Sequence, residues 1–185
     1  MEFNSFERTG SKSTEPVARE AVNRKIARES AAEGMVLLQN DGVLPLSKDE
    51  SIAIFGSGAN HTIKGGTGSG EVNEREAVTI LEGLRNAGLK IENEDWLKVY
   101  DDSYQKARLE WKDRIIERCH GNTESVDFFV AHAENPFRAP KGREITKQDL
   151  GKADVAIYVV SRIAGEGSDR KEEKGDYYLS DSEEL

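Results

Sequence analysis

One acidic side chain stands where a parallel α/β sheet usually places its chemistry. Glu166 lies between Gly165 and Gly167 in the stretch GEGSDR, after the apolar run 155–161 (VAIYVVS). Ligands of open α/β sheets gather at the carboxyl ends of strands, and a carboxylate flanked by glycines has little steric cover. The pattern therefore presents a carboxylate where chemistry tends to occur, and a solvated loop glutamate is the plainer alternative.

Two glycine clusters follow another apolar run, residues 51–55 (SIAIF). The first, 56–58 (GSG), begins like a dinucleotide fingerprint, but the third glycine would fall at His61 and the acidic residue expected about 20 positions on is missing. The second, 65–70 (GGTGSG), lacks the lysine of a phosphate loop. We predict no cofactor. The second cluster is either a flexible connector or a backbone surface that a ligand can approach closely.

The other reactive side chains show no catalytic or metal-binding spacing. His61, His120 and His132 are scattered and are predicted to be loop residues, and Cys119 is the one cysteine. A lone thiol cannot form an internal disulfide, and this set does not make a structural zinc site. We therefore predict no metal.

Composition excludes several classes of partner. The 185 residues suit one domain and carry 26 Lys and Arg against 35 Asp and Glu, a net charge of −9. This charge repels phosphate backbones and anionic lipids, so neither nucleic acid nor membrane is an expected partner. No apolar run approaches the roughly 18 residues of a membrane span, and the N-terminus has no export-signal pattern. A single cysteine fits a reducing compartment, and we predict a cytoplasmic location.

The elements that would position these residues begin after a polar N-terminal arm, residues 1–14. The rest, residues 15–185, is predicted as one partial domain. Apolar spacing predicts a helix over 15–35, with Thr14 as its cap and Pro16 in its first turn. The stretch QNDG turns the chain, and the β-branched run 51–55 predicts a buried strand.

Two further helices and a short strand are predicted before residue 120. Asn73 and Glu76 form a capping-box pattern for a helix that stops at Gly88, and 89–91 predicts a short strand. A charged helix follows over 94–119 and should lie on a surface. Its thin apolar stripe comprises Trp96, Val99, Tyr104, Leu109, Trp111, Ile115 and Ile116.

The C-terminal third has the strongest strand. Residues 120–145 are predicted to be irregular because two prolines exclude a continuous helix, and 146–150 predicts one helical turn. The run 155–161 is the most strand-like in the chain. Ser180 and Glu183 form a capping-box pattern that would open a last helix, but the five residues that follow the cap, up to Leu185, are too few for a stable one.

Strands that alternate with helices predict an α/β fold with a parallel sheet, since parallel strands need helical crossovers. Three strands are few for a sheet whose faces and edges must be covered. We therefore expect an incomplete, Rossmann-like three-layer sandwich with few strands and flanking helices.

Four segments together resemble glycoside hydrolase family 3, the β-glucosidase family. They are residues 27–46 (ARESAAEGMVLLQNDGVLPL), the strand and turn SIAIFGSGAN, the loop GGTGSGEVN, and residues 153–185, which include GEGSDR. Their order and separations are compatible with the family, and the likeness runs from about residue 18 to 185. It is similar to the α/β sandwich domain that accompanies a (β/α)8 barrel in this family.

The resemblance implies roles for particular residues. A retaining hydrolase of β-linked oligosaccharides or glycosides uses an aspartate nucleophile from the barrel, and Glu166 matches the general acid/base lent by the sandwich domain. Lys64, Thr67 and Ser69 would line the sugar-binding cleft. The turn around Glu166 would be shaped by Gly165, Gly167, Asp169 and Arg170, with Arg170 able to pair with Asp169.

The barrel and its nucleophile motif have no counterpart in this sequence, so we expect the chain to be inactive alone. The chain matches either the front of an enzyme with rearranged domain order or a cut or frameshifted remnant of the usual order. Two rival interpretations stay open: a non-catalytic carbohydrate- or nucleotide-binding module, and a remnant that needs a partner chain carrying the barrel.

Overall fold

The computed structural model describes residues 15–66, 70, 76–164 and 169–184. The chain divides into two compact units, residues 1–44 and 45–185. In the first, helix α1 spans Ala18–Glu33 and buries none of its residues. Its N-cap position is taken by Val17 in an extended conformation, so the prediction that Pro16 lies in the first helical turn is wrong. The predicted cap, Thr14, lies outside the described residues.

The turn predicted at QNDG is present and is held by one asparagine. Asn40 Oδ1 accepts the backbone N–H groups of Gly42 and Leu44, both at 3.1 Å, and its Nδ2 donates to the Leu44 carbonyl at 2.9 Å. The Asn40 side chain thus pairs backbone groups of the turn that a strand or helix would otherwise pair, which explains why asparagine suits the position.

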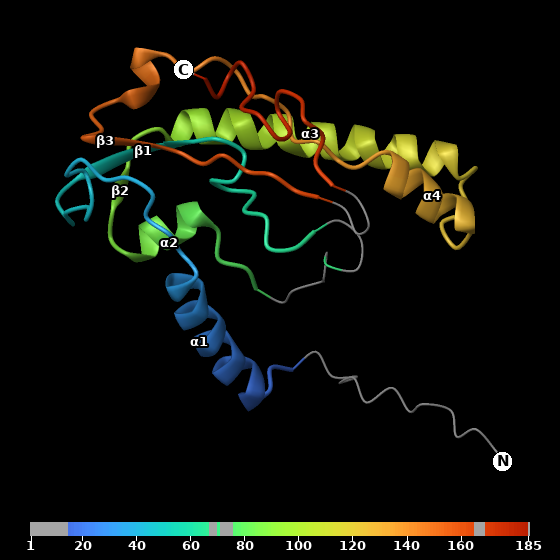
Figure 1. Ribbon diagram of the computed structural model, residues 1–185, viewed down its shortest axis with the longest axis horizontal. Helices are drawn as coiled ribbons and strands as arrows, with labels where there is room; N and C mark the ends of the chain where they lie inside the picture. The colour runs from blue at the N-terminus through green and yellow to red at the C-terminus, as the bar shows by residue number, and fades with distance from the viewer. Residues whose placement is uncertain (1–14, 67–69, 71–75, 165–168, 185) are drawn as a thin grey trace. The chain divides into compact units, whose positions relative to one another are not determined.

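The second unit contains a parallel sheet of three strands in the order β2-β1-β3 (Figure 1). The strands are β1 (Ser51–Phe55), β2 (Lys90–Ile91) and β3 (Val155–Tyr158). Both neighbours run parallel to β1, which confirms the predicted α/β class. The central strand is buried on both faces, as its continuous apolar sequence requires.

The third strand is shorter than the predicted 155–161. Its register pairs Tyr158 with Phe55, the last residue of β1. Gly56 then turns the chain out of the sheet at a φ of 89°, so β1 offers no partner beyond this point except the Phe55 carbonyl, which accepts from Val159 N at 2.9 Å. The strand therefore ends where its neighbour ends.

Helix α2 (Ile80–Asn86) begins later than predicted. Thr79 Oγ1 caps it by accepting from Glu82 N at 3.1 Å, and Glu82 Oε2 accepts from the Thr79 backbone N–H at 2.9 Å, which completes a capping box. The chain offers two such patterns, at 73/76 and 79/82, and the structure uses the second, so the helix does not include Glu76. Asn73 lies outside the described residues. The predicted stop at Gly88 is confirmed by its φ of 89°.

Helix α3 (Glu94–Arg118) matches its predicted span and contributes to two apolar clusters. Its first turns pack Trp96, Leu97 and Tyr100 against β1, whereas Trp111 and Ile115 pack against α4. The predicted apolar stripe is wrong at three positions, where the side chains are exposed: Val99, Leu109 and Ile116.

Helix α4 (Val126–Glu134) lies in the segment predicted to be irregular, so that prediction is wrong there. Ser125 caps it by accepting Phe128 N at 3.4 Å, and the helix packs along the second half of α3 (Figure 1). Both prolines come after its end, so they do not interrupt it. A short 3₁₀ turn, η1 (Lys147–Leu150), confirms the predicted helical turn.

The capping-box pattern at residues 180–183 is present without a helix. Ser180 and Glu183 do form the expected side-chain contacts, with Ser180 N and Oγ both donating to Glu183 Oε2 at 2.8 Å. Residues 181–183 form a turn, and no helix starts within the described residues up to 184. The Glu183 carboxylate also accepts hydrogen bonds from Arg162 Nη1 and Nη2.

Asn93 takes the place of a third residue in β2. The Ile52 carbonyl accepts from the backbone N–H of Glu92. Two residues further along β1, Ile54 pairs with a side chain instead of a strand: Asn93 Oδ1 accepts from Ile54 N at 3.0 Å, and Asn93 Nδ2 donates to the Ile54 carbonyl at 2.7 Å. This lets the chain leave β2 for α3 without leaving buried backbone groups unpaired.

We expect Asn93→Ala to lower the free energy of unfolding by about 2–4 kcal/mol, because it strands a buried N–H and a buried C=O. Urea denaturation measures the loss. Asn86→Ala is the matched control, since Asn86 is exposed on α2 and should tolerate the change. A loss for Asn93→Ala no larger than that of the control would contradict the role assigned to this side chain.

Candidate active site at the strand ends

The first glycine cluster serves close packing between β1 and β3. A Cβ atom built on Gly56 would lie 2.3 Å from the carbonyl oxygen of Val159, and one on Gly58 would lie 2.6 Å from Val159 Cγ1. Both glycines thus let the turn after β1 lie against the chain that leaves β3. This accounts for the cluster without a nucleotide.

The segment that leads from this turn into the second glycine cluster is fastened to α2. Thr62 Oγ1 donates to the Gly58 carbonyl at 2.7 Å and accepts from Ile80 N at 3.0 Å. Leu81 N donates to the Ala59 carbonyl at 2.9 Å. The start of α2 and the end of β1 therefore hold the segment between them.

The same segment is fastened to α3 through His61. Its ring stacks on Tyr104 with centroids 3.5 Å apart, and its Nε2 lies 2.8 Å from Asp101 Oδ1. Burial lowers the pKa of His61, and the neighbouring Asp101 carboxylate opposes this shift. Sequence reasoning predicted a loop position for His61 and missed these contacts, since Asp101 lies 40 positions away.

The second glycine cluster reaches the chain just before the predicted catalytic turn. A Cβ on Gly66 would lie 2.7 Å from the carbonyl oxygen of Ala164, and one on Gly65 would lie 2.2 Å from that of Gly70. Lys64, a predicted sugar-binding residue, is exposed beside these glycines. The other two predicted binding residues, Thr67 and Ser69, lie outside the described residues.

The turn predicted to carry the acid/base is described only at its flanks. Glu166, Gly165 and Gly167 lie outside the described residues. On the C-terminal side, the Arg170 guanidinium lies over the Tyr177 ring, 5.8 Å from its centroid. The pairing of Arg170 with Asp169 stays a prediction.

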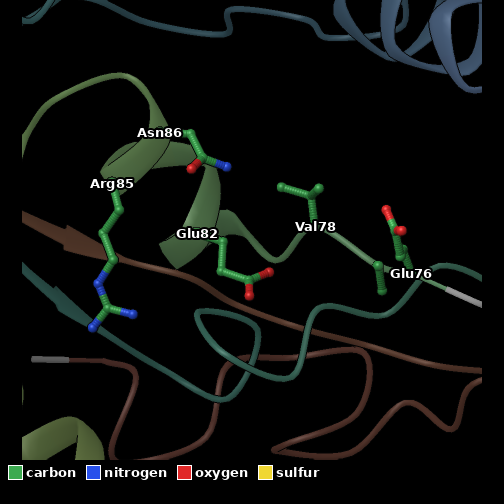
Figure 2. A pocket seen from close by; sticks show the side chains of 6 residues that line it. Glu76, Val78, Glu82, Arg85 and Asn86 are labelled. Carbon is green, nitrogen blue, oxygen red and sulfur yellow. The ribbon is translucent and has the colours of Figure 1, made fainter.

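A hollow lies elsewhere, over α2 and the segment before it (Figure 2). Figure 2 shows Glu76 and Val78 on the extended chain and Glu82 and Arg85 on the helix. The charged groups on α2 already have partners: Glu82 caps the helix, and Arg85 Nη2 donates to both carboxylate oxygens of Glu94 at 2.6 and 2.7 Å. We therefore place the candidate site at the strand ends.

The other two histidines and the cysteine have structural surroundings. His132 lies on α4, not in a loop as predicted, with its ring edge-on to Trp111. His120 is in the turn after α3, and Cys119 is buried with its Sγ donating to the Ile116 carbonyl at 3.3 Å. The described part of the chain contains no cluster of ligands that could hold a metal ion. Among the same residues, every helix is too short or too polar to cross a membrane.

Comparison with known proteins gives consistent matches. The profile described as "Glycosyl hydrolase family 3 C-terminal domain" matches residues 35–182. A "Beta-glucosidase" of Ruminococcus albus is 35% identical over 161 residues, which cover 85% of this chain and 15% of that protein. "Beta-glucosidase A" of Butyrivibrio fibrisolvens is 32% identical over 149 residues, covering 80% and 16%.

A solved structure, that of β-glucosidase 3B from Thermotoga neapolitana in complex with α-D-glucose, superposes with a TM-score of 0.66 at 38% identity. The match covers 93% of this chain and 22% of that protein. The chain thus spans about a fifth or less of the length of these relatives.

Proposed function

The chain belongs to glycosyl hydrolase family 3, as a C-terminal domain of that family, and on this premise we propose that it supplies the general acid/base of a retaining β-glucosidase. The proposed residue is Glu166. The observation that supports it is the contact between Gly66 and Ala164. It brings the beginning of the second glycine cluster against the residue that precedes GEGSDR in the sequence, and α/β folds bind ligands at the ends of their strands.

The proposed chemistry needs two carboxyl groups about 5–5.5 Å apart. A nucleophile on a barrel domain, outside these 185 residues, attacks the anomeric carbon while the Glu166 carboxylic acid protonates the departing glycosidic oxygen. The Glu166 carboxylate then takes a proton from the water that displaces the enzyme from the sugar. The substrate is a β-linked oligosaccharide or glycoside, and no cofactor takes part.

The binding residues follow from the same placement. Lys64 is exposed and lies two residues before Gly66, which meets Ala164, so Lys64 and the nearby Thr67 and Ser69 are proposed to line the sugar site. Asp169 and Arg170 are proposed to shape the turn, and the position of Arg170 over the Tyr177 ring supports this for Arg170.

A complementation assay tests the proposal. The 185-residue chain alone should not hydrolyse 4-nitrophenyl β-glucoside, because one of the two carboxyl groups is absent. Mixing it with the barrel domain of a family 3 β-glucosidase, or fusing the two, should produce hydrolysis with retention of the anomeric configuration. Hydrolysis by the chain alone, or a combined enzyme no faster than its barrel, would refute the proposal.

A further inference from the structure

Arg162 makes five hydrogen bonds through its side chain. It lies four residues after the end of β3, and its side chain is 15% exposed. Nε donates to the Asp176 carbonyl at 2.7 Å. Nη1 donates to the Ser161 carbonyl at 2.9 Å and to Glu183 Oε1 at 2.8 Å. Nη2 donates to Glu183 Oε2 at 2.6 Å and to the Tyr178 carbonyl at 3.4 Å.

These contacts use the whole guanidinium. Arginine carries five N–H donors, and each has an acceptor here. The Glu183 carboxylate neutralises the charge in a bidentate pair, the strongest geometry that an arginine and a carboxylate can form. Arg162 holds the pKa of Glu183 down to about 2, so the pair stays ionised at neutral pH. An arginine with no remaining donor is not available to bind a substrate.

Two of the acceptors, the Asp176 and Tyr178 carbonyls, lie on a segment that is itself folded. Lys171 N donates to Asp176 Oδ2 at 3.0 Å, and the Lys171 carbonyl accepts from Tyr177 N at 3.1 Å. Tyr178 N donates to the Glu173 carbonyl at 3.2 Å. Arg162 thus attaches a compact turn, residues 171–178, to the chain that continues β3.

The attachment points lie on both sides of the predicted catalytic turn. Ser161 and Arg162 lie before it, and the acceptors between residues 176 and 183 lie after it. On the upstream side, Ala164 already packs against Gly66. The ends of the stretch 163–175 are therefore held together by one side chain.

We propose that Arg162 is a positioning residue for the proposed acid/base: by joining the chain before the GEGSDR stretch to residues 176–183 after it, Arg162 fixes the two points between which Glu166 lies in the sequence. The part that concerns Glu166 rests on the function proposed above. The joining of the two sides by Arg162 does not, and it can be tested separately on the 185-residue chain.

Amide hydrogen exchange on the 185-residue chain tests the joining. Arg162→Met should raise exchange at residues 169–179 by about tenfold or more, while the β1 amides keep their protection. Arg162→Lys should not restore protection, because an ammonium lacks the planar fork that reaches three carbonyls and a carboxylate. Arg85→Met removes another bidentate pair, that with Glu94, and is the control that should leave 169–179 unchanged.

Unchanged exchange at 169–179 would overturn the proposal, and so would equal acceleration in β1, which would mean that Arg162 only stabilises the whole unit. If Arg162→Met does not fold, Glu183→Gln serves instead. It keeps the shape of the side chain and weakens the pair, so it should accelerate exchange in the same residues.

Kinetics of the enzyme combined with a barrel tests the link to Glu166. Arg162→Lys should lower kcat/KM, which reports the first step, by about tenfold for cellobiose, whose leaving group needs protonation, and by less than about twofold for 2,4-dinitrophenyl β-glucoside. Equal losses on both substrates would overturn the positioning role. If Glu166→Gln also lacks this dependence on the leaving group, the proposed function fails, whereas the exchange result still decides whether Arg162 joins the two sides.

Discussion

We expect Glu166→Gln to lower the hydrolysis of cellobiose about 10²–10⁴-fold in the enzyme assembled from this chain and a family 3 barrel. Glutamine keeps the size of the side chain but has no proton to give to the glycosidic oxygen and no basicity with which to activate water. Steady-state rates on cellobiose measure the loss. A substrate whose leaving group needs no proton, such as 2,4-dinitrophenyl β-glucoside, should retain its first step and accumulate the glycosyl-enzyme.

Glu172→Gln is the matched control for this prediction. Glu172 lies just past the same turn and is exposed, so the same change of charge should alter the rate on cellobiose by less than about twofold. A Glu166→Gln enzyme within about threefold of the unmodified one would assign the acid/base role to another residue.

The second large effect is expected at Gly56. Replacing it with alanine should lower the free energy of unfolding by about 2–5 kcal/mol, since a φ of 89° is strained for alanine and its Cβ would lie 2.3 Å from the Val159 carbonyl oxygen. The backbone on both sides must then separate, which breaks the junction between β1 and β3. Urea or thermal denaturation of the chain measures the loss.

Gly83→Ala is the control for this prediction. Gly83 lies inside α2 and nothing lies within 4 Å of a Cβ built on it, so alanine should stabilise the chain by about 0.5–1 kcal/mol. Equal stability of the two alanine variants would show that β1 and β3 do not meet through Gly56 as described.

The parts of the fold that the sequence predicts well are those in which local pattern and burial agree. The runs SIAIF and VAIYVVS are β-branched and apolar, and they form β1 and β3. The long helix α3 follows from its periodic apolar positions, although only packing decides which of them are buried. Helix α4 is not predicted, because two prolines exclude a continuous helix over 120–145, whereas the helix that forms is short, begins after Ser125 and ends before both prolines.

The candidate site was predicted less completely, for a physical reason. A glutamate between glycines after a strand is visible in the sequence, and so is a glycine cluster that matches a family. The contacts that hold these segments join residues far apart in the chain: His61 with Asp101, and Arg162 with Glu183. Such pairs depend on how the helices and turns pack, which neither spacing nor composition encodes.

The side chain of Asn93 also limits how the sheet can grow. It occupies the position along β1 where β2 would otherwise continue, so β1 is saturated on that side, and β2 offers only two residues to a new neighbour. Of the strands in the described residues, β3 therefore has the longer outer edge. Another strand, from elsewhere in a longer polypeptide or from a second molecule, would take its direction and register from β3.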